Sequence, residues 1–352
     1  MTPCENYLRA FLKETKWLST HDFMKIALQD PKYGYYAQQQ AIGVQNDFIT
    51  APEISQLFGE TLGFWLLSRW EQLGCPSPFI LLELGPGRGT LLTDLLRIAS
   101  QKNDFINGLH LYLVDINPHL KENQKAALSK YKPQWFDSLA DALEMSQELP
   151  MFIIANEFLD AFPIHQYELT SSGWYERGVH INSQDKLAFS LNETSLDFMN
   201  ISFPHPLKPG DIYEICPEAI NIIQQIGSYL NQHQGTALFI DYGYTEGIGD
   251  TFQALYKHQY ISPFDHLGEA DLTAHVNFNM LIKTLNKFPT LIKYIALQSD
   301  FLKSWGIEMW TEKLMQNASL SQKNSMVKGL NRLLSTYQMG SLFKVLEVYT
   351  AC

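Results

Sequence analysis

The residues that most constrain the fold lie between Phe79 and Arg97, where the chain reads FILLELGPGRGTLLTDLLR. An apolar run leads to three alternate glycines, Gly85, Gly87 and Gly89, and a pattern of helical period begins directly after them. This order predicts a strand, a tight turn and a helix. Glycine adopts a positive φ and leaves room for a ligand beside the backbone, so the turn is a candidate binding site.

The spacing of the glycines distinguishes between cofactors. A turn that binds a dinucleotide has the pattern G-x-G-x-x-G, whereas this chain has E-x-G-x-G-x-G. The carboxylate of Glu83 suits the ammonium of a methionine moiety, and Asp115, at the end of the next predicted strand, is placed for a ribose diol. We therefore expect S-adenosyl-L-methionine rather than NAD. The alternative is a Rossmann-like domain that has lost its ligand.

The charge balance and the cysteines exclude several classes of function. The chain has 37 acidic and 26 basic residues, a net charge of −11, which disfavours nonspecific binding to nucleic acid but is compatible with a basic protein substrate. Its four cysteines form no CxxC pair, so neither a zinc site nor a disulfide framework is expected. The sequence has neither a leader-like N-terminus nor an apolar run of about 18 residues. We therefore expect a cytoplasmic protein without membrane insertion.

Short apolar runs alternate with helical patterns along the core of the chain. The predicted strands are Phe79–Leu84, Leu109–Val114, Gln134–Phe136, Met151–Ala155, Thr236–Ile240 and Leu342–Tyr349. This alternation favours an α/β fold with a doubly wound, mostly parallel, Rossmann-like sheet. Ligands bind beyond the carboxyl ends of such strands. The first five strands end at the polar residues Glu83, Asp115, Asp137, Asn156 and Asp241.

Further elements are predicted around this core. Capping signatures begin a helix at Thr2 and a second, long helix at Thr50, which carries Ile54 to Leu66. Two gaps between strands are far longer than a crossover needs. The first gap contains the strand-like runs HQYELT, GWYERGVHI and KLAFSL and the helical pattern Pro217–Leu230. We expect an N-terminal helical or lid region (1–77), a cofactor-binding core (78–163), an inserted α+β substrate region (164–234) and the remainder of the core with a helical insertion (235–352).

The fourth predicted strand runs into ANEFLDAF, which places Asn156, Glu157 and Asp160 at the mouth of the sheet. An arginine guanidinium stays protonated at cellular pH, and a methyltransferase that acts on it needs carboxylates to hold its fork. We expect Glu157 and Asp160 to orient such an acceptor, with Asn156 beside them. The alternative is that Asn156 and Glu157 cap a following helix. Asp137 is a candidate partner for the adenine amino group or, alternatively, the N-cap of the next helix.

Residues 264–278, FDHLGEADLTAHVNF, gather acidic residues and two histidines, which raises the question of a metal site. The segment lacks a compact HxxxH or His/Cys pair. We therefore favour structural or substrate-pocket roles and expect no bound metal.

Six longer motifs occur along the chain: IGVQNDFITAPEISQLFGE (42–60), ELGPGRGTL, ANEFLDAFPIHQY, DTFQALYKHQY, GEADLTAHVNF and MGSLFKVL. In this order they resemble the MidA-like family of S-adenosyl-L-methionine-dependent methyltransferases, whose mitochondrial members are complex I assembly factors. The resemblance spans nearly the whole chain. It implies a class I methyltransferase fold with an additional substrate-covering region, S-adenosyl-L-methionine as cofactor, and methylation of protein arginine.

Carried over by position, the resemblance implies that Gly85-Pro86-Gly87-Arg88-Gly89 and Asp115 hold the cofactor. Segment Asn46–Glu53 is then expected to lie over it, and Asn156 to Asp160 to face the acceptor. Further candidates for cofactor contacts are Ile116, Asp47 and Thr50. The family's usual glycine, glutamate and aspartate are replaced here by Asn46, Asp115 and Asn277, and none of these changes removes cofactor binding.

The leading hypothesis is a methyltransferase that uses S-adenosyl-L-methionine to methylate arginine in a protein substrate. The alternatives are an assembly or chaperone-like binding protein with a structural or vestigial cofactor site, and a small-molecule methyltransferase. An NAD-dependent dehydrogenase is disfavoured because the glycine spacing is wrong. The N-terminus does not resemble a transit peptide, so we expect a substrate that differs from that of the mitochondrial members or is absent. The oligomeric state is left open.

Overall fold

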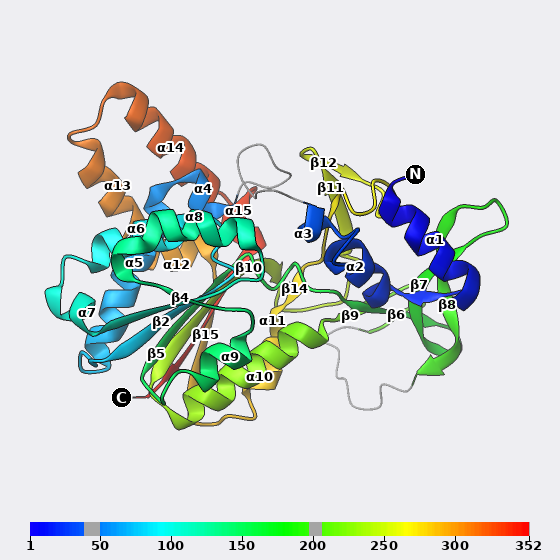
Figure 1. Cartoon of the computed structure of the whole chain (residues 1–352), viewed down its shortest axis with the longest axis horizontal. Coiled ribbons are helices and arrows are strands. Elements are labelled where there is room, and N and C mark those ends of the chain that lie inside the picture. The colour runs from blue at the N-terminus through cyan, green and yellow to red at the C-terminus, as the bar shows by residue number, and fades with distance from the viewer. Residues whose placement is uncertain (39–49, 197–205, 352) are drawn as a thin grey trace. The chain divides into compact units, whose positions relative to one another are not determined.

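Figure 1 shows a computed structural model that describes residues 1–38, 50–196 and 206–351. The chain forms two compact units. We call the first the accessory unit: Met1–Gln40, Asp160–Asn221 and Tyr244–Met280. The second, the sheet unit, comprises Ala41–Leu159, Ile222–Gly243 and Leu281–Cys352. The described residues contain no helix that combines the length and apolar character needed to cross a membrane.

The sheet unit is built on a large mixed sheet with the strand order β15-β16-β10-β5-β2-β3-β4. Its strands are β2 (Phe79–Leu84), β3 (Leu109–Val114), β4 (Gln134–Phe136), β5 (Met151–Asn156), β10 (Gly235–Tyr244), β15 (Leu291–Leu297) and β16 (Phe343–Thr350). Strands β10, β5, β2, β3 and β4 pair in parallel, whereas β16 is antiparallel to both of its neighbours. The predicted doubly wound, mostly parallel sheet is confirmed.

Helices lie over both faces of this sheet (Figure 1). One face carries α5 (Gln56–Gln72), α6 (Thr90–Ala99) and α8 (Pro118–Leu128), and the other α9 (Leu139–Glu144) and the part of α10 (Pro217–Gln232) that belongs to this unit. The remaining helices of the unit are α4 (Ala51–Ile54), α7 (Asn103–Gly108), the 3-10 helix η1 (Ser129–Tyr131), α12 (Gln298–Ser304), α13 (Ile307–Met315), α14 (Leu320–Leu334), α15 (Met339–Leu342) and the end of α11 (Phe278–Leu285).

The burial of the central strands explains their sequences. Every residue of β2 and of β5 is buried. Strands covered on both faces have continuous apolar runs instead of alternating ones, as FILLEL and MFIIAN do. Phe79 and Leu81 share one core cluster with Trp65 of α5 and Leu95 of α6. The polar residue at the carboxyl end of such a strand is therefore an exception that calls for an explanation at that edge of the sheet.

The accessory unit contains an antiparallel sheet with the order β1-β7-β6-β9, in which β8 also pairs with β7, and a smaller sheet with the order β12-β11-β13. Its strands are β1 (Leu18–Ser19), β6 (His165–Thr170), β7 (Gly173–Ile181), β8 (Leu187–Leu196), β9 (Ile212–Ile215), β11 (Gln253–Tyr256), β12 (Gln259–Ile261), β13 (Asp271–Thr273) and β14 (Val276–Asn277). Its helices are α1 (Pro3–Thr15), α2 (Thr20–Gln29) and α3 (Tyr35–Gln38). Phe23 and Met24 of α2 share a second core with Val179 of β7.

The prediction of one long helix from Thr50 is wrong. Helix α4 ends at Ile54, and α5 begins after Ser55, whose backbone is extended at φ −161° and ψ 131°. The Ser55 hydroxyl accepts a hydrogen bond from the Leu57 N–H at 3.3 Å, so it caps a new helix. The Thr50 side chain makes no capping hydrogen bond. The Glu53 carboxylate instead accepts a hydrogen bond from the Thr90 hydroxyl at 2.7 Å.

Candidate functional site

The glycine turn connects β2 to α6 and has a positive φ at all three glycines: 65° at Gly85, 53° at Gly87 and 79° at Gly89. A Cβ at Gly85 would lie 2.6 Å from the Phe158 ring, and a Cβ at Gly89 would lie 3.3 Å from Leu128. A Cβ at Gly87 would meet no atom of the described residues within 4 Å. The turn is thus packed against the protein at its two ends and open at its centre, as a cradle for a ligand requires.

Asp115 follows β3, and its carboxylate is held on both oxygens. Oδ1 accepts a hydrogen bond from the Asn117 N–H at 2.8 Å, and Oδ2 accepts one from Gln124 Nε2 at 2.6 Å. Burial raises the pKa of Asp115, while both hydrogen bonds act in the opposite direction. Ile116, the next residue, is 72% exposed, which leaves an apolar side chain open beside this carboxylate.

Glu83, at the end of β2, is 2% exposed, and its Oε2 has no hydrogen-bond partner among the described residues. Burial, together with the negative charge of Asp115, raises the pKa of Glu83 to about 8. A buried carboxyl oxygen without a donor is costly in a folded protein. This feature therefore indicates that a donor or a cation from outside the described residues binds here.

The turn after β5 carries Asn156 and Glu157. Glu157 has a positive φ of 49°, which is unusual for a residue with a side chain. Its N–H donates to the Ile240 carbonyl at 2.8 Å, and its Oε1 accepts from the Ala51 N–H at 2.7 Å. No helix follows in residues 157–164, so the alternative in which Asn156 and Glu157 cap the next helix is wrong. The Glu157 carboxylate instead receives the first N–H of α4.

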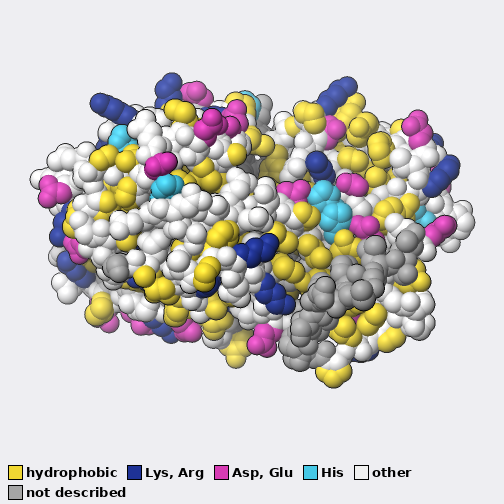
Figure 2. All heavy atoms as spheres, turned by 90° about the horizontal axis from the view of Figure 1, so that it is seen from below, with side chains coloured by type: hydrophobic (Ala, Val, Ile, Leu, Met, Phe, Trp, Pro, Cys, Tyr) yellow, Lys and Arg dark blue, Asp and Glu magenta, His cyan; other side chains and the backbone are white. Residues whose placement is uncertain are grey.

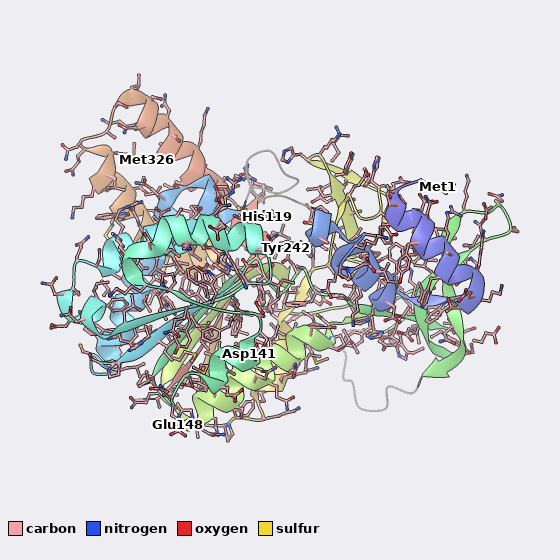
Figure 3. All side chains as sticks on the ribbon, in the orientation of Figure 1. Met1, His119, Asp141, Glu148, Tyr242 and Met326 are labelled. Atoms are coloured by element: carbon pink, nitrogen blue, oxygen red, sulfur yellow. The ribbon has the colours of Figure 1, made fainter. Side chains whose placement is uncertain are left out.

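Asp241, near the end of β10, holds this turn in place. It is 1% exposed, and its Oδ2 accepts hydrogen bonds from the Phe158 N–H at 3.2 Å and the Leu159 N–H at 2.9 Å. In Figure 3 the labelled Tyr242, the residue after Asp241, and the labelled His119 of α8 lie toward the same edge of the sheet. The sequence placed Asp241 at a strand end but gave no indication of this contact.

Two other predicted residues have different surroundings. Asp137 is exposed and forms an ion pair of 2.7 Å with Lys121, and the N-cap of α9 is Ser138, so the alternative that Asp137 caps that helix is wrong.

Asp160 is buried in the accessory unit, where its carbonyl accepts from the Ala274 N–H at 3.3 Å. Burial, with the charges of Asp271 and Asp160, raises the pKa of Tyr36 well above its ordinary value. Asp47 lies outside the described residues.

Three histidines of the accessory unit, His21, His165 and His266, pair with acidic residues. In residues 264–278, His266 Nδ1 lies 3.2 Å from Glu269 Oε2. His21 and His165 stack with ring centroids 4.5 Å apart, and His165 Nδ1 lies 2.6 Å from a Glu176 oxygen. Figure 2 shows histidine side chains with acidic ones around them in the right half of the face seen from below. Within the described ranges, no group of three or more His, Cys, Asp or Glu side chains could hold a metal ion.

The glycine turn and its neighbours fit an adenosyl cofactor with a charged amino-acid tail. Besides Glu83 Oε2, two of the buried atoms that lack partners among the described residues lie in the glycine turn or at the end of β5: Arg88 Nε and Asn156 Oδ1. A carboxyl oxygen, an amide oxygen and a guanidinium nitrogen are suited to an ammonium, a hydroxyl and a carboxylate. With the open Gly87 and the immobilised Asp115, this edge of the sheet offers partners for the ammonium, the carboxylate and the ribose of S-adenosyl-L-methionine.

Comparisons with known proteins agree with this chemistry. Residues 61–292 match the model of a family described as "Putative S-adenosyl-L-methionine-dependent methyltransferase". The chain is 33% identical to "Protein arginine methyltransferase NDUFAF7, mitochondrial" of Xenopus tropicalis, over 97% of this chain and 85% of that protein. The identity to the human protein of the same name is 32%, over 97% and 82%. A Burkholderia thailandensis protein, solved with bound S-adenosyl-homocysteine, has a TM-score of 0.79 and 24% identity, with 98% of this chain and 91% of that chain covered.

The comparisons correct one prediction. The sequence led to the expectation of a cytoplasmic protein, but the similar proteins of Xenopus tropicalis, Xenopus laevis and Homo sapiens are all named mitochondrial. The expected cytoplasmic location is therefore wrong. The physical reason is that location is not encoded in the fold: an acidic, well-packed α/β core serves equally in either compartment.

Proposed function

The chain belongs to the family of S-adenosyl-L-methionine-dependent methyltransferases, and on this premise we propose that it methylates arginine side chains of a protein substrate. The observation that carries the proposal is the turn after β5, where Glu157 is held in a strained backbone at the same edge of the sheet as the glycine turn. The similarity over 97% of the chain to proteins named as protein arginine methyltransferases supports it.

We assign the cofactor-binding roles to the residues of this edge. Glu83 would bind the ammonium, Asp115 the ribose diol, and the turn from Gly85 through Pro86 to Gly89 would let the cofactor approach the backbone. The exposed Ile116 would pack on the adenine ring, and Asp137 would accept from its amino group. Thr50 and Asp47 would lie over the cofactor. When bound, S-adenosyl-L-methionine supplies a methyl group activated by a positively charged sulfur.

The acceptor side rests on carboxylates. A guanidinium stays protonated at any cellular pH, and its planar fork pairs with a carboxylate through two hydrogen bonds. Glu157 would orient that fork, with Asn156 beside it. The left-handed backbone of Glu157 costs about 1–3 kcal/mol. A strained backbone of this kind is expected where the side chain must point in one direction. Alignment of this kind contributes up to about 7–11 kcal/mol to a two-substrate reaction. The nitrogen that gains the methyl group releases its proton to solvent or to a nearby carboxylate.

The proposal is tested with the full chain and S-adenosyl-L-methionine labelled in the methyl group. Proteins of a lysate are incubated with both, hydrolysed, and analysed for labelled methylarginine. Glu157→Gln is expected to reduce the label by about a hundredfold or more and to keep the affinity for S-adenosyl-homocysteine. Glu144→Gln, an exposed position of α9, serves as the matched control and is expected to behave as the unmodified chain.

Two other results would reject arginine methylation. Label in small molecules alone would show a small-molecule methyltransferase. Cofactor binding without any transfer, in the unmodified chain as in Glu157→Gln, would indicate a binding protein in which the cofactor is structural.

A further inference from the structure

Gln124 of α8 is 0% exposed and links three elements of the sheet unit. Its Nε2 donates to the Gly87 carbonyl at 2.8 Å and to Asp115 Oδ2 at 2.6 Å. Its Oε1 accepts from Trp135 Nε1 of β4 at 2.8 Å. One buried amide therefore joins the open centre of the glycine turn, the carboxylate after β3 and an indole on the neighbouring strand.

The orientation of this amide is determined by its partners. An indole nitrogen can only donate, so the Gln124 oxygen faces Trp135 and the NH₂ group faces the other two residues. The Gly87 carbonyl and the Asp115 carboxylate can only accept, which fits both donors. An amide flip would place two acceptors against the Gln124 oxygen and two donors against each other. The arrangement is thus held in a single state.

The contacts reach both parts of the site to which the cofactor was assigned above. Gly87 has a positive φ, and a Cβ there would meet no atom of the described residues within 4 Å, so the hydrogen bond to its carbonyl is a contact that fixes the orientation of its peptide. The Asp115 carboxylate, with Asn117 N–H on one oxygen and Gln124 on the other, cannot turn about its last bond. A preorganised acceptor binds a ligand more tightly than one that must be ordered on binding.

We propose that Gln124 is a positioning residue for cofactor binding, which holds the Gly87 carbonyl and the Asp115 carboxylate in one arrangement so that both engage the cofactor together. The inference rests on the proposed placement of S-adenosyl-L-methionine at the glycine turn. Gln124 acts through Asp115 and Gly87 and touches no reacting atom. Its loss therefore weakens cofactor binding and raises the KM for the cofactor, while kcat at saturating cofactor changes little.

The test measures S-adenosyl-homocysteine binding to the full chain by calorimetry, with thermal unfolding in parallel. Gln124→Met keeps the shape of the side chain and removes all three hydrogen bonds; we expect an affinity loss of about tenfold or more. Gln298→Met is the matched control, because Gln298 is another glutamine of the sheet unit with 0% exposure, bonded to the Leu333 carbonyl. It is expected to lower the unfolding temperature no more than Gln124→Met does, because Gln298 Oε1 has no partner among the described residues, and to change the affinity by less than about twofold.

A second variant keeps the proposal testable if Gln124→Met fails to fold. Trp135→Phe removes the donor that orients the amide, together with part of the ring, and leaves both donor groups of Gln124 in place; we expect an intermediate loss of affinity. A double-mutant cycle with Asp115→Asn adds a readout that a purely structural role would not produce. If Gln124 acts through Asp115, the effect of Gln124→Met is smaller in the Asp115→Asn background.

The outcomes are distinguishable. No binding by the unmodified chain would overturn the placement of the cofactor and the inference with it. Normal binding by the unmodified chain and equal binding by Gln124→Met would overturn the inference alone. The same holds if Gln298→Met loses as much affinity as Gln124→Met, or if the effects of Gln124→Met and Asp115→Asn simply add.

Discussion

The two units of this chain differ in charge far more than in size. The residues of the accessory unit include 18 acidic and 9 basic side chains, a net charge of −9, whereas the sheet unit has 19 acidic and 17 basic ones, a net charge of −2. The unit that carries the glycine turn is thus nearly neutral, and the other carries most of the charge of the chain. These are separate physical tasks: a cofactor is bound by buried, specific contacts, whereas a basic protein is attracted by a broad acidic field.

The largest expected effect is on cofactor affinity, and it compares the same substitution, glycine to valine, in each of the two units. Gly87 in the sheet unit and Gly210 in the accessory unit both have a positive φ, 53° and 94°, and a Cβ at either would meet no atom of the described residues within 4 Å. Valine at either position costs about 1–3 kcal/mol of backbone strain. Gly87→Val is expected to abolish binding of S-adenosyl-L-methionine in calorimetry, because its side chain fills the cradle. Gly210→Val is expected to lose similar stability and to keep the affinity. Equal affinities in the two variants would reject the assignment of the turn.

The next effect concerns how the sheet unit positions Glu157. Asp241→Asn keeps one acceptor for the Phe158 and Leu159 N–H groups but removes the charge. Hydrogen bonds to a charged group are worth about 1.5–3 kcal/mol, so the turn after β5 is expected to loosen. We expect methyl transfer at saturating cofactor to fall by about tenfold or more, with little change in cofactor affinity. Unchanged kcat would show that the Glu157 turn is held without Asp241.

The two units also differ in how far the sequence predicted them. Runs such as FILLEL and MFIIAN are buried on both faces, so hydrophobicity alone located β2 and β5 to within one residue. In the accessory unit the alternating runs of β6 and β7 were found. The short β9, β11, β12 and β13 were missed because three or four residues hold too little periodicity. β15, which is seven residues long and in the sheet unit, was also missed: LIKYIAL is interrupted by Lys293 and joins an edge position.

In the candidate site, too, some residues were predicted from the sequence and others were missed. Residue type and position at a strand end were sufficient to propose Glu83, Asp115 and Glu157, since a charge at the end of a buried strand is conspicuous. Gln124 was missed, because a glutamine within a helix gives no signal until the packing of α8 against the glycine turn is known. The role of Ser55 in ending α4 was missed because the apolar pattern continues through it. The four predicted regions remain a prediction; α4 and α5, within the predicted region 1–77, belong to the sheet unit.

The next prediction concerns how the free energy of unfolding depends on pH through two buried glutamates, one in each unit. Burial and Asp115 raise the pKa of Glu83 to about 8, and burial raises that of Glu214 in the accessory unit to about 7. The folded-state pKa of each glutamate lies above the ordinary value of 4.5. Each neutral carboxyl therefore contributes its full stability below pH 4.5, and this contribution is lost as the pH rises through the folded-state pKa. The free energy of unfolding is therefore expected to fall as pH rises toward about 8.

The two glutamates are expected to differ in ligand binding. A cation at Glu83 requires the carboxylate, so affinity for S-adenosyl-L-methionine rises between pH about 6 and about 8, by at most about tenfold per unit. Glu83→Gln removes this dependence. Glu214 is satisfied by Thr251 and Gln166, so Glu214→Gln changes the pH dependence of unfolding and leaves that of binding intact. Calorimetry across this pH range checks both, and a flat affinity profile in the unmodified chain would contradict a cation at Glu83.

The smallest expected effect follows from the charge difference itself. Exposed charges are screened over about 8 Å at physiological ionic strength, while buried contacts are screened much less. If the net charge of −9 on the accessory unit attracts a basic substrate, the KM for that substrate rises by a few fold as salt is increased from about 0.05 to about 0.3 M. The dissociation constant for S-adenosyl-homocysteine, which is bound by buried groups of a nearly neutral unit, changes by less than about twofold. Steady-state kinetics and calorimetry in the same buffers compare the two. A KM for the protein substrate that is as insensitive to salt as the cofactor affinity would mean that the acidic field has no part in recognition. The acceptor would then be selected by the local carboxylates alone, with Glu157 foremost among them.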